Sequence, residues 1–110
     1  MRKIKNDKKS VARFSKDMMH KLVLNIHRPH WNLSTFAVLM NRVVEEVEEL
    51  DAEVERIIST NYEMGKKKEV LYKVINEAAD VANCAMFLAD NAHEQIAKME
   101  ELEALLLETK

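Results

Sequence analysis

The scarcity of residues that interrupt helices is the feature that most constrains the fold of this chain. Its 110 residues include one Pro and one Gly, Pro29 and Gly65. Both types disfavour helix, because Pro lacks an amide donor and Gly has excess backbone freedom. Leu, Val, Ala, Glu, Lys and Met dominate instead, and most of these favour helix. The sequence therefore predicts an all-α protein, a single domain over residues 1–110 in which residues 1–8 can fray.

Apolar residues at spacings of three and four predict the first two helices. The first spans about residues 9–25 and ends before Pro29, which cannot continue a helix. The second begins where Asn32 or Ser34 caps it, and it runs to about Thr60. The apolar stripe of this second helix, which we expect to face the core, is Phe36, Met40, Val43, Val47, Leu50, Val54 and Ile57.

A connector around Gly65 separates these helices from the C-terminal part of the chain. The third helix begins near Lys67, and a fourth begins at Asn91, where Asn91 and Glu94 resemble a capping pair. The alternative is one continuous helix through this boundary. Because a short connector favours antiparallel neighbours, we expect a four-helix, bundle-like fold with an antiparallel central pair. The inward stripe of the third helix is then Leu71, Val74, Ala78, Val81, Ala85 and Leu88.

Acidic residues crowd the second helix. The run "VVEEVEELDAEVE" from Val43 to Glu55 contains no Lys, although like charges three or four apart repel by a few tenths of a kcal/mol. At about 100° per residue, Glu46 and Glu49 lie on one flank of the apolar stripe. Such a run alone is most often a solvated face, so a functional interpretation needs a second observation.

The third helix supplies a matching pair of acids. Glu77 and Asp80 lie on the corresponding flank, and antiparallel packing places equal flanks on the same side. Glu46 and Asp80 are equidistant from residue 63, as are Glu49 and Glu77, so four carboxylates should converge at one level. They cannot all stay ionised without compensation, and Mg²⁺ prefers oxygen ligands. This geometry leaves a metal site and a solvated acidic face as equal alternatives.

The acidic pattern resembles the hallmark of the MazG-like all-α nucleoside triphosphate pyrophosphohydrolases, E-E-x-x-E followed after a spacer by E-x-x-D. The spacer here is toward the long end for that family. The flanking stretches "MMHKLVLNIHRPHW" and "DVANCAMFLAD" are also similar to phage and prokaryotic members, so that the resemblance covers about residues 18–91. The residues that carry the motif are Glu45-Glu46-Val47-Glu48-Glu49 and Glu77-Ala78-Ala79-Asp80.

This resemblance implies hydrolysis of a (deoxy)nucleoside triphosphate between its α and β phosphates, to a monophosphate and pyrophosphate. Glu46, Glu49, Glu77 and Asp80 would hold Mg²⁺, for which Mn²⁺ can substitute, and Glu45 would be a supporting ligand or base. The implied catalytic residues are Glu45, Glu46 and Glu49. The resemblance also implies a fold completed by oligomerisation, as a homodimer or a dimer of dimers.

Several other residues are candidates for contact with a nucleotide. Trp31 can stack on a base, although a single Trp is more often a core or interface anchor. His27 can touch base or phosphate, although loop histidines are commonly just exposed. Asn83 can bond a base or sugar, or pack at a helix interface. Arg42 and Lys73 each precede an acid of the motif by four residues, and can meet phosphate or pair with the acids.

Composition argues against several other classes of protein. The net charge is −2, so the chain lacks the excess of basic residues that is typical of a nucleic-acid-binding protein. No apolar run reaches the roughly 20 residues of a membrane span, so we expect no membrane partner. The lone Cys84 forms no disulfide within the chain, and a reducing cytoplasm is the default.

Two rival functions stay open beside the hydrolase. A di-iron carboxylate bundle expects E-x-x-H pairs, and neither His20 nor His93 follows a Glu by three residues. A non-catalytic helical interaction module, or a degenerate relative of the family, is the second rival. Failure to bind Mg²⁺ would favour it.

Overall fold

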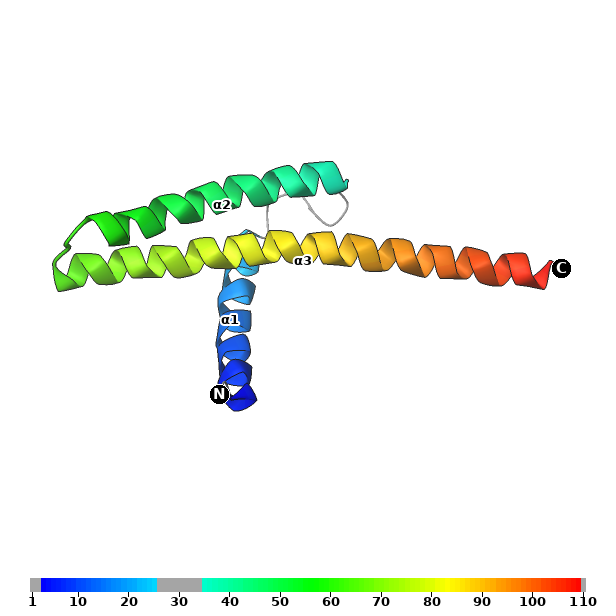
Figure 1. The fold of residues 1–110 in the computed structure, drawn as a ribbon, viewed down its shortest axis with the longest axis horizontal. Coiled ribbons are helices and arrows are strands. Elements are labelled where there is room, and N and C mark those ends of the chain that lie inside the picture. The colour runs from blue at the N-terminus through cyan, green and yellow to red at the C-terminus, as the bar shows by residue number, and fades with distance from the viewer. Residues whose placement is uncertain (1–2, 26–34, 110) are drawn as a thin grey trace.

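The computed structural model describes residues 3–25 and 35–109, and these ranges contain three helices and no strand. The helices are α1 (Ile4–Leu24), α2 (Phe36–Ser59) and α3 (Met64–Glu108), drawn in Figure 1. The prediction of an all-α chain is confirmed for the described residues.

The predicted division between a third and a fourth helix at Asn91 is wrong. Helix α3 continues through this position as one element of 45 residues. The Asn91 side chain accepts a hydrogen bond from Gln95 Nε2 at 2.7 Å, one turn further along the same helix. No Gly or Pro follows Gly65, and a helix that has been nucleated extends readily where nothing interrupts it. The alternative of one continuous helix is therefore the one that the structure adopts.

The helix starts also differ from the sequence predictions. Helix α1 begins at Ile4, within the stretch expected to fray, and α3 begins at Met64, shortly before Lys67. The N-cap of α2 is Thr35, whose hydroxyl accepts a hydrogen bond from the Val38 amide at 3.3 Å. The predicted cap is therefore wrong, and its two candidate residues lie outside the described ranges.

Helices α2 and α3 lie side by side and antiparallel, as the sequence predicts (Figure 1). Helix α1 approaches α3 at a steep angle, with its C-terminal end against the middle of α3. The last part of α3 extends beyond the start of α2 without a neighbouring helix drawn along it. The two predicted acids of α3, Glu77 and Asp80, lie in the part of α3 that both other helices contact.

The face of α2 that packs on α3 is rotated from the predicted stripe toward the acidic flank. Leu39 is 0% exposed and Glu46 is 2% exposed, whereas the predicted core residues Phe36, Met40 and Val47 are 44%, 51% and 45% exposed. The apolar stripe is wider than one helix–helix contact, so it cannot all be covered by α3 alone. Glu46 therefore lies in the contact itself and not on its flank.

The core of the described chain is small. Its buried apolar residues are Leu39, Val70, Ala79 and Cys84. The accessible surface is 8,996 Å², whereas a compact monomer of this mass exposes about 6,300 Å². Much apolar surface is therefore uncovered in a single copy.

Candidate functional site

Three acids from the two antiparallel helices meet at one level. Glu46 comes from α2, and Glu77 and Asp80 come from adjacent turns of α3. One carboxylate oxygen from each residue lies within 4.8 Å of those of the other two. The hairpin produces this meeting because residues equidistant from its connector lie at the same height on antiparallel helices. We call these three residues the acidic cluster.

Glu49, the fourth predicted ligand, lies beside the acidic cluster but is more exposed than its members. It is close enough to Glu46 and to Glu77 to share a proton with either, and its charge repels both. Ionised carboxylates are acceptors only, so such a hydrogen bond exists only when one of the pair is protonated. Glu49 is therefore a neighbour that can approach the cluster, and the buried contacts belong to the other three.

Two oxygens of the acidic cluster have no hydrogen-bond partner. Oε2 of Glu46 and Oε2 of Glu77 are both buried without a donor, and Glu46 as a whole is almost fully buried. A buried carboxylate oxygen without a donor or cation raises the free energy of the folded state, because it loses its hydrogen bonds to water and forms no others. A bound cation or a proton would therefore stabilise these two atoms.

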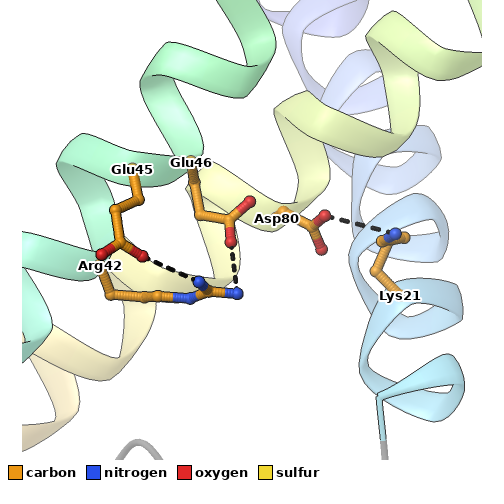
Figure 2. Close-up of polar contacts among 5 residues, drawn as sticks. All are labelled: Lys21, Arg42, Glu45, Glu46 and Asp80. Carbon is orange, nitrogen blue, oxygen red and sulfur yellow. Dashed lines mark hydrogen bonds and ion pairs between the residues drawn. The ribbon is translucent and has the colours of Figure 1, made fainter.

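Two cations flank the acidic cluster (Figure 2). Arg42 places Nη2 2.7 Å from Glu46 Oε1, and Lys21 of α1 places Nζ 3.3 Å from Asp80 Oδ2. Glu46 and Asp80 lie between the two cations, so each has one partner on its outer side. The two cations compensate part of the negative charge and orient the carboxylates of Glu46 and Asp80.

Glu45 lies apart from the acidic cluster. Its carboxylate pairs with Arg42 at 3.0 Å, and its side chain is 61% exposed. Arg42 thus bridges Glu45 and Glu46, which follow it by three and four residues on α2 (Figure 2). Glu45 is therefore an exposed ion-pair partner of Arg42.

Burial raises the pKa of Glu46 to about 7. Arg42 opposes this shift, while Glu49 and Asp80 add to it by hydrogen bonding or repulsion. The pKa of Glu77 is also raised, first by burial and then by Glu49 and Asp80, against the opposing charge of Lys21. Without a further cation, Glu46 therefore tends to hold a proton near neutral pH, and the raised pKa of Glu77 acts in the same direction.

The three predicted substrate-binding residues are placed unequally. Asn83 is buried where α1 meets α3, and its Nδ2 donates to the Met18 carbonyl oxygen at 3.1 Å. This is the helix-interface alternative of the sequence analysis, although Asn83 Oδ1 has no hydrogen-bond partner. His27 and Trp31 lie outside the described residues, so their proposed contacts with nucleotide stay predictions.

Lys21 is the site residue that the sequence analysis missed. On α1 it lies close to the apolar residues Met18 and Leu22, and its side chain is largely buried beside Asp80. A Lys at the edge of an apolar stripe is a usable signal, because a desolvated ammonium needs an acid nearby. Which acid it meets depends on the crossing of α1 and α3, which no local pattern encodes.

A groove between α1 and α3 is separate from the acidic cluster. It encloses about 520 Å³ and has a mixed apolar and polar lining. No member of the acidic cluster lines it. Its lining residues are Ser10, Arg13, Phe14, Asp17, Val74, Ile75 and Ala78.

Comparisons of the chain with protein-family models, with curated proteins and with solved structures found no match. The resemblance to the MazG-like pyrophosphohydrolases therefore rests on the quoted residues, and the acidic cluster is interpreted from its own geometry. Among the helices of residues 3–25 and 35–109, none combines the length and apolar character needed to cross a membrane.

Proposed function

We propose that this chain is a Mg²⁺-dependent nucleoside triphosphate pyrophosphohydrolase of MazG-like type. The observation that carries the proposal is the acidic cluster. One oxygen from each of its three carboxylates lies within 4.8 Å of the other two, and two of its buried oxygens have no donor. A hard divalent cation is the partner that such an all-oxygen set fits best. The motif that resembles the family supplies the substrate class.

Glu46, Glu77 and Asp80 would hold the cation, and Glu49 lies near enough to complete the set. Mn²⁺ can substitute for Mg²⁺, because both accept octahedral oxygen ligands. Bound there, the cation supplies neutralisation of triphosphate charge and polarisation of its phosphorus–oxygen bonds. The donor set fits this role, since its unpartnered oxygens need positive charge.

The chain's own residues would then divide the remaining work. Water attacks the α-phosphorus, the bond from that phosphorus to the α–β bridging oxygen breaks, and pyrophosphate leaves. We assign acceptance of the water proton to Glu49, which is exposed beside the cluster. Glu45 is a weaker candidate for this base, because Arg42 already engages it.

We propose that the active form is a homo-oligomer, as the resemblance implies, and that it acts on nucleotide pools in the cytoplasm. The support for oligomerisation is the small core of one copy and the exposed apolar flank of α2. Apolar area of this kind is commonly covered by association. Residues on this flank are Phe36, Met40, Val44 and Val47.

The test is a panel of canonical and modified triphosphates incubated with Mg²⁺, with quantification of monophosphate, pyrophosphate and orthophosphate. We expect equimolar monophosphate and pyrophosphate, and a loss of at least a hundredfold in turnover for Glu77→Gln. Glu48→Gln is the matched control, because Glu48 is exposed and outside the acidic cluster. Release of orthophosphate alone, or no turnover across the panel, would refute the assignment.

A non-catalytic helical interaction module is the second candidate. The observation in its favour is that Arg42 and Lys21 pair with Glu46 and Asp80, at 2.7 and 3.3 Å, so side chains compensate part of the negative charge of the acidic cluster. Calorimetric titration separates the two candidates, since the hydrolase requires saturable Mg²⁺ binding and the module does not. A di-iron site lacks support, because neither His20 nor His93 belongs to the acidic cluster.

A further inference from the structure

The C-terminal part of α3 has no cover from the described residues. Every residue from His93 to Glu108 is exposed, and Figure 1 shows this part of the helix extending past the start of α2. At 1.5 Å per residue it is about 24 Å long. We call residues 93–108 the overhang.

The overhang has an apolar stripe that continues the face of α3 that packs on α2. Its residues are Ile96, Met99, Leu102 and Leu106. Eighteen residues make about five turns, so Val70, Leu88 and Leu106 point in nearly the same direction. Glu77, which meets Glu46 of α2, lies within about 20° of that direction. Val70 is 1% exposed, whereas Leu106 is 57% exposed. The same face is thus covered by α2 in one half of α3 and bare in the other.

We propose that a second copy of this chain covers the overhang, with the two overhangs packed antiparallel around a two-fold axis near Met99. A helix laid on the bare face continues the line of α2, which begins at Phe36. In a parallel pair, the first half of the partner's α3 would occupy the place of α2. In an antiparallel pair that part of the partner lies on the far side of Glu108, away from α2.

The stripe is self-complementary about Met99. Ala92 and Leu106 each lie seven residues from it, and Ile96 and Leu102 each lie three residues from it. In the antiparallel pair the small Ala92 therefore meets the large Leu106 of the other copy, and Ile96 meets Leu102. Small-against-large pairing fills a helix contact evenly, and a two-fold interface requires such self-complementarity.

The area suits a modest but specific interface. Ile96, Met99, Leu102 and Leu106 are 51–60% exposed. Covering them and their flanks buries on the order of 500 Å² per copy and 1,000 Å² in total, the lower bound for a specific interface. The flanks of the overhang are rich in Glu, so we expect association to strengthen as salt screens their repulsion.

Cysteine cross-linking of the full chain tests the antiparallel geometry. Under mild oxidation, Met99→Cys should give a disulfide-linked dimer and Leu106→Cys should not. In the antiparallel pair the two Leu106 positions lie about 21 Å apart, beyond the reach of about 7 Å between Cα atoms. The native chain is the background control, because its Cys84 is buried. Cross-linking of both variants would indicate a parallel pair and overturn the geometry, and absence of the Met99→Cys product would overturn the proposal.

Sedimentation velocity tests the association itself. Met99→Lys should weaken self-association at least tenfold, because it buries two ammonium groups against each other at the axis. Leu105→Lys is the matched control, since Leu105 is 58% exposed against 60% for Met99 but points about 120° away from it. Circular dichroism checks that both variants stay helical. Equal weakening by both variants, or no weakening by Met99→Lys, would overturn the proposal, whatever the outcome of the nucleotide assays.

Discussion

Glu46 is one of the two buried residues of α2, and the other, Leu39, is apolar. The burial of Glu46 is tolerated through Arg42 on one oxygen, while its other oxygen has no partner. A group in this state must hold a proton, recruit a cation or destabilise the fold. Its electrostatics can therefore be tested by pH, by substitution and by metal.

The stability of the metal-free protein should depend on the protonation of Glu46. Its pKa is about 7 in the folded chain, above the usual 4.5, so the bound proton favours the folded state. This contribution is complete below about pH 4.5 and is lost as the pH rises through 7, by roughly 1–3 kcal/mol. Urea denaturation between pH 5 and 8 measures it. Glu46→Gln should flatten the curve, and an equal slope in both proteins would contradict the assignment.

Removal of the Glu77 charge should separate the roles of the cluster in binding and in folding. Glu77→Gln relieves repulsion from Glu49 and Asp80, so the free energy of unfolding without metal should hold or rise by about 1 kcal/mol. Mg²⁺ binding should be lost. Denaturation and calorimetry measure the two effects, with Glu48→Gln as the neutral reference. A clear loss of metal-free stability would mark Glu77 as a structural residue.

At the scale of the elements, α3 is one helix with two different surroundings. Its first half packs on α1 and α2, whereas its overhang has no described neighbour in a single copy. Covered and bare parts of one helix should differ in their response to the same disruption, because packing and not propensity supplies most helix stability in proteins.

Proline substitution in the two halves tests this difference. Ala82→Pro, in the covered half, should cost about 3 kcal/mol or more, because it removes a helix hydrogen bond and clashes with the preceding turn. Ala97→Pro, in the overhang, should lower the ellipticity at 222 nm. At protein concentrations low enough to keep the chain monomeric, it should change the free energy of unfolding of the packed half by less than about 1 kcal/mol. Thermal and urea melts measure both. A large destabilisation by Ala97→Pro would show that the overhang is integral to the fold of one copy.

At the scale of the whole molecule, the chain is extended. Its radius of gyration is 18.9 Å, against about 13 Å for a compact domain of this length. The longest dimension, 71 Å, is close to the roughly 68 Å length of α3 alone. One copy therefore consists of α3 with two shorter helices packed on its first half. Its free energy of unfolding should increase when a ligand binds the folded form.

Mg²⁺ should stabilise the folded chain as a whole. At one hundred times its dissociation constant a ligand of the folded state adds about 2.7 kcal/mol to the free energy of unfolding. The effect should saturate and should strengthen as the pH rises through 7, because Glu46 must release its proton before it can bind a cation. Melts in MgCl₂, compared with NaCl of equal ionic strength, measure it. Equal melting temperatures in the two salts would argue for the interaction module.

The amino-acid sequence was enough to predict an all-helical chain, the antiparallel pairing of α2 with α3, and the meeting of Glu46 with Glu77 and Asp80. The near-absence of Gly and Pro allows long helices, and the spacing of three and four, together with equal distances from the connector, sets which residues share a height. Spacing along a helix and distance from the connector are local properties, so they can be predicted from a single sequence.

Packing between the helices sets which face of each helix is covered, and the sequence pattern leaves that face open. The apolar stripe of α2 is wider than one contact, so its rotation, and with it the burial of Glu46, depends on the partner that packs against it. The arrival of Lys21 at Asp80 depends on how α1 crosses α3, and the continuity of α3 at Asn91 depends on the balance between a cap and an uninterrupted helix. Helical periodicity fixes spacing along an axis, whereas rotation about that axis is set by packing between elements distant in sequence.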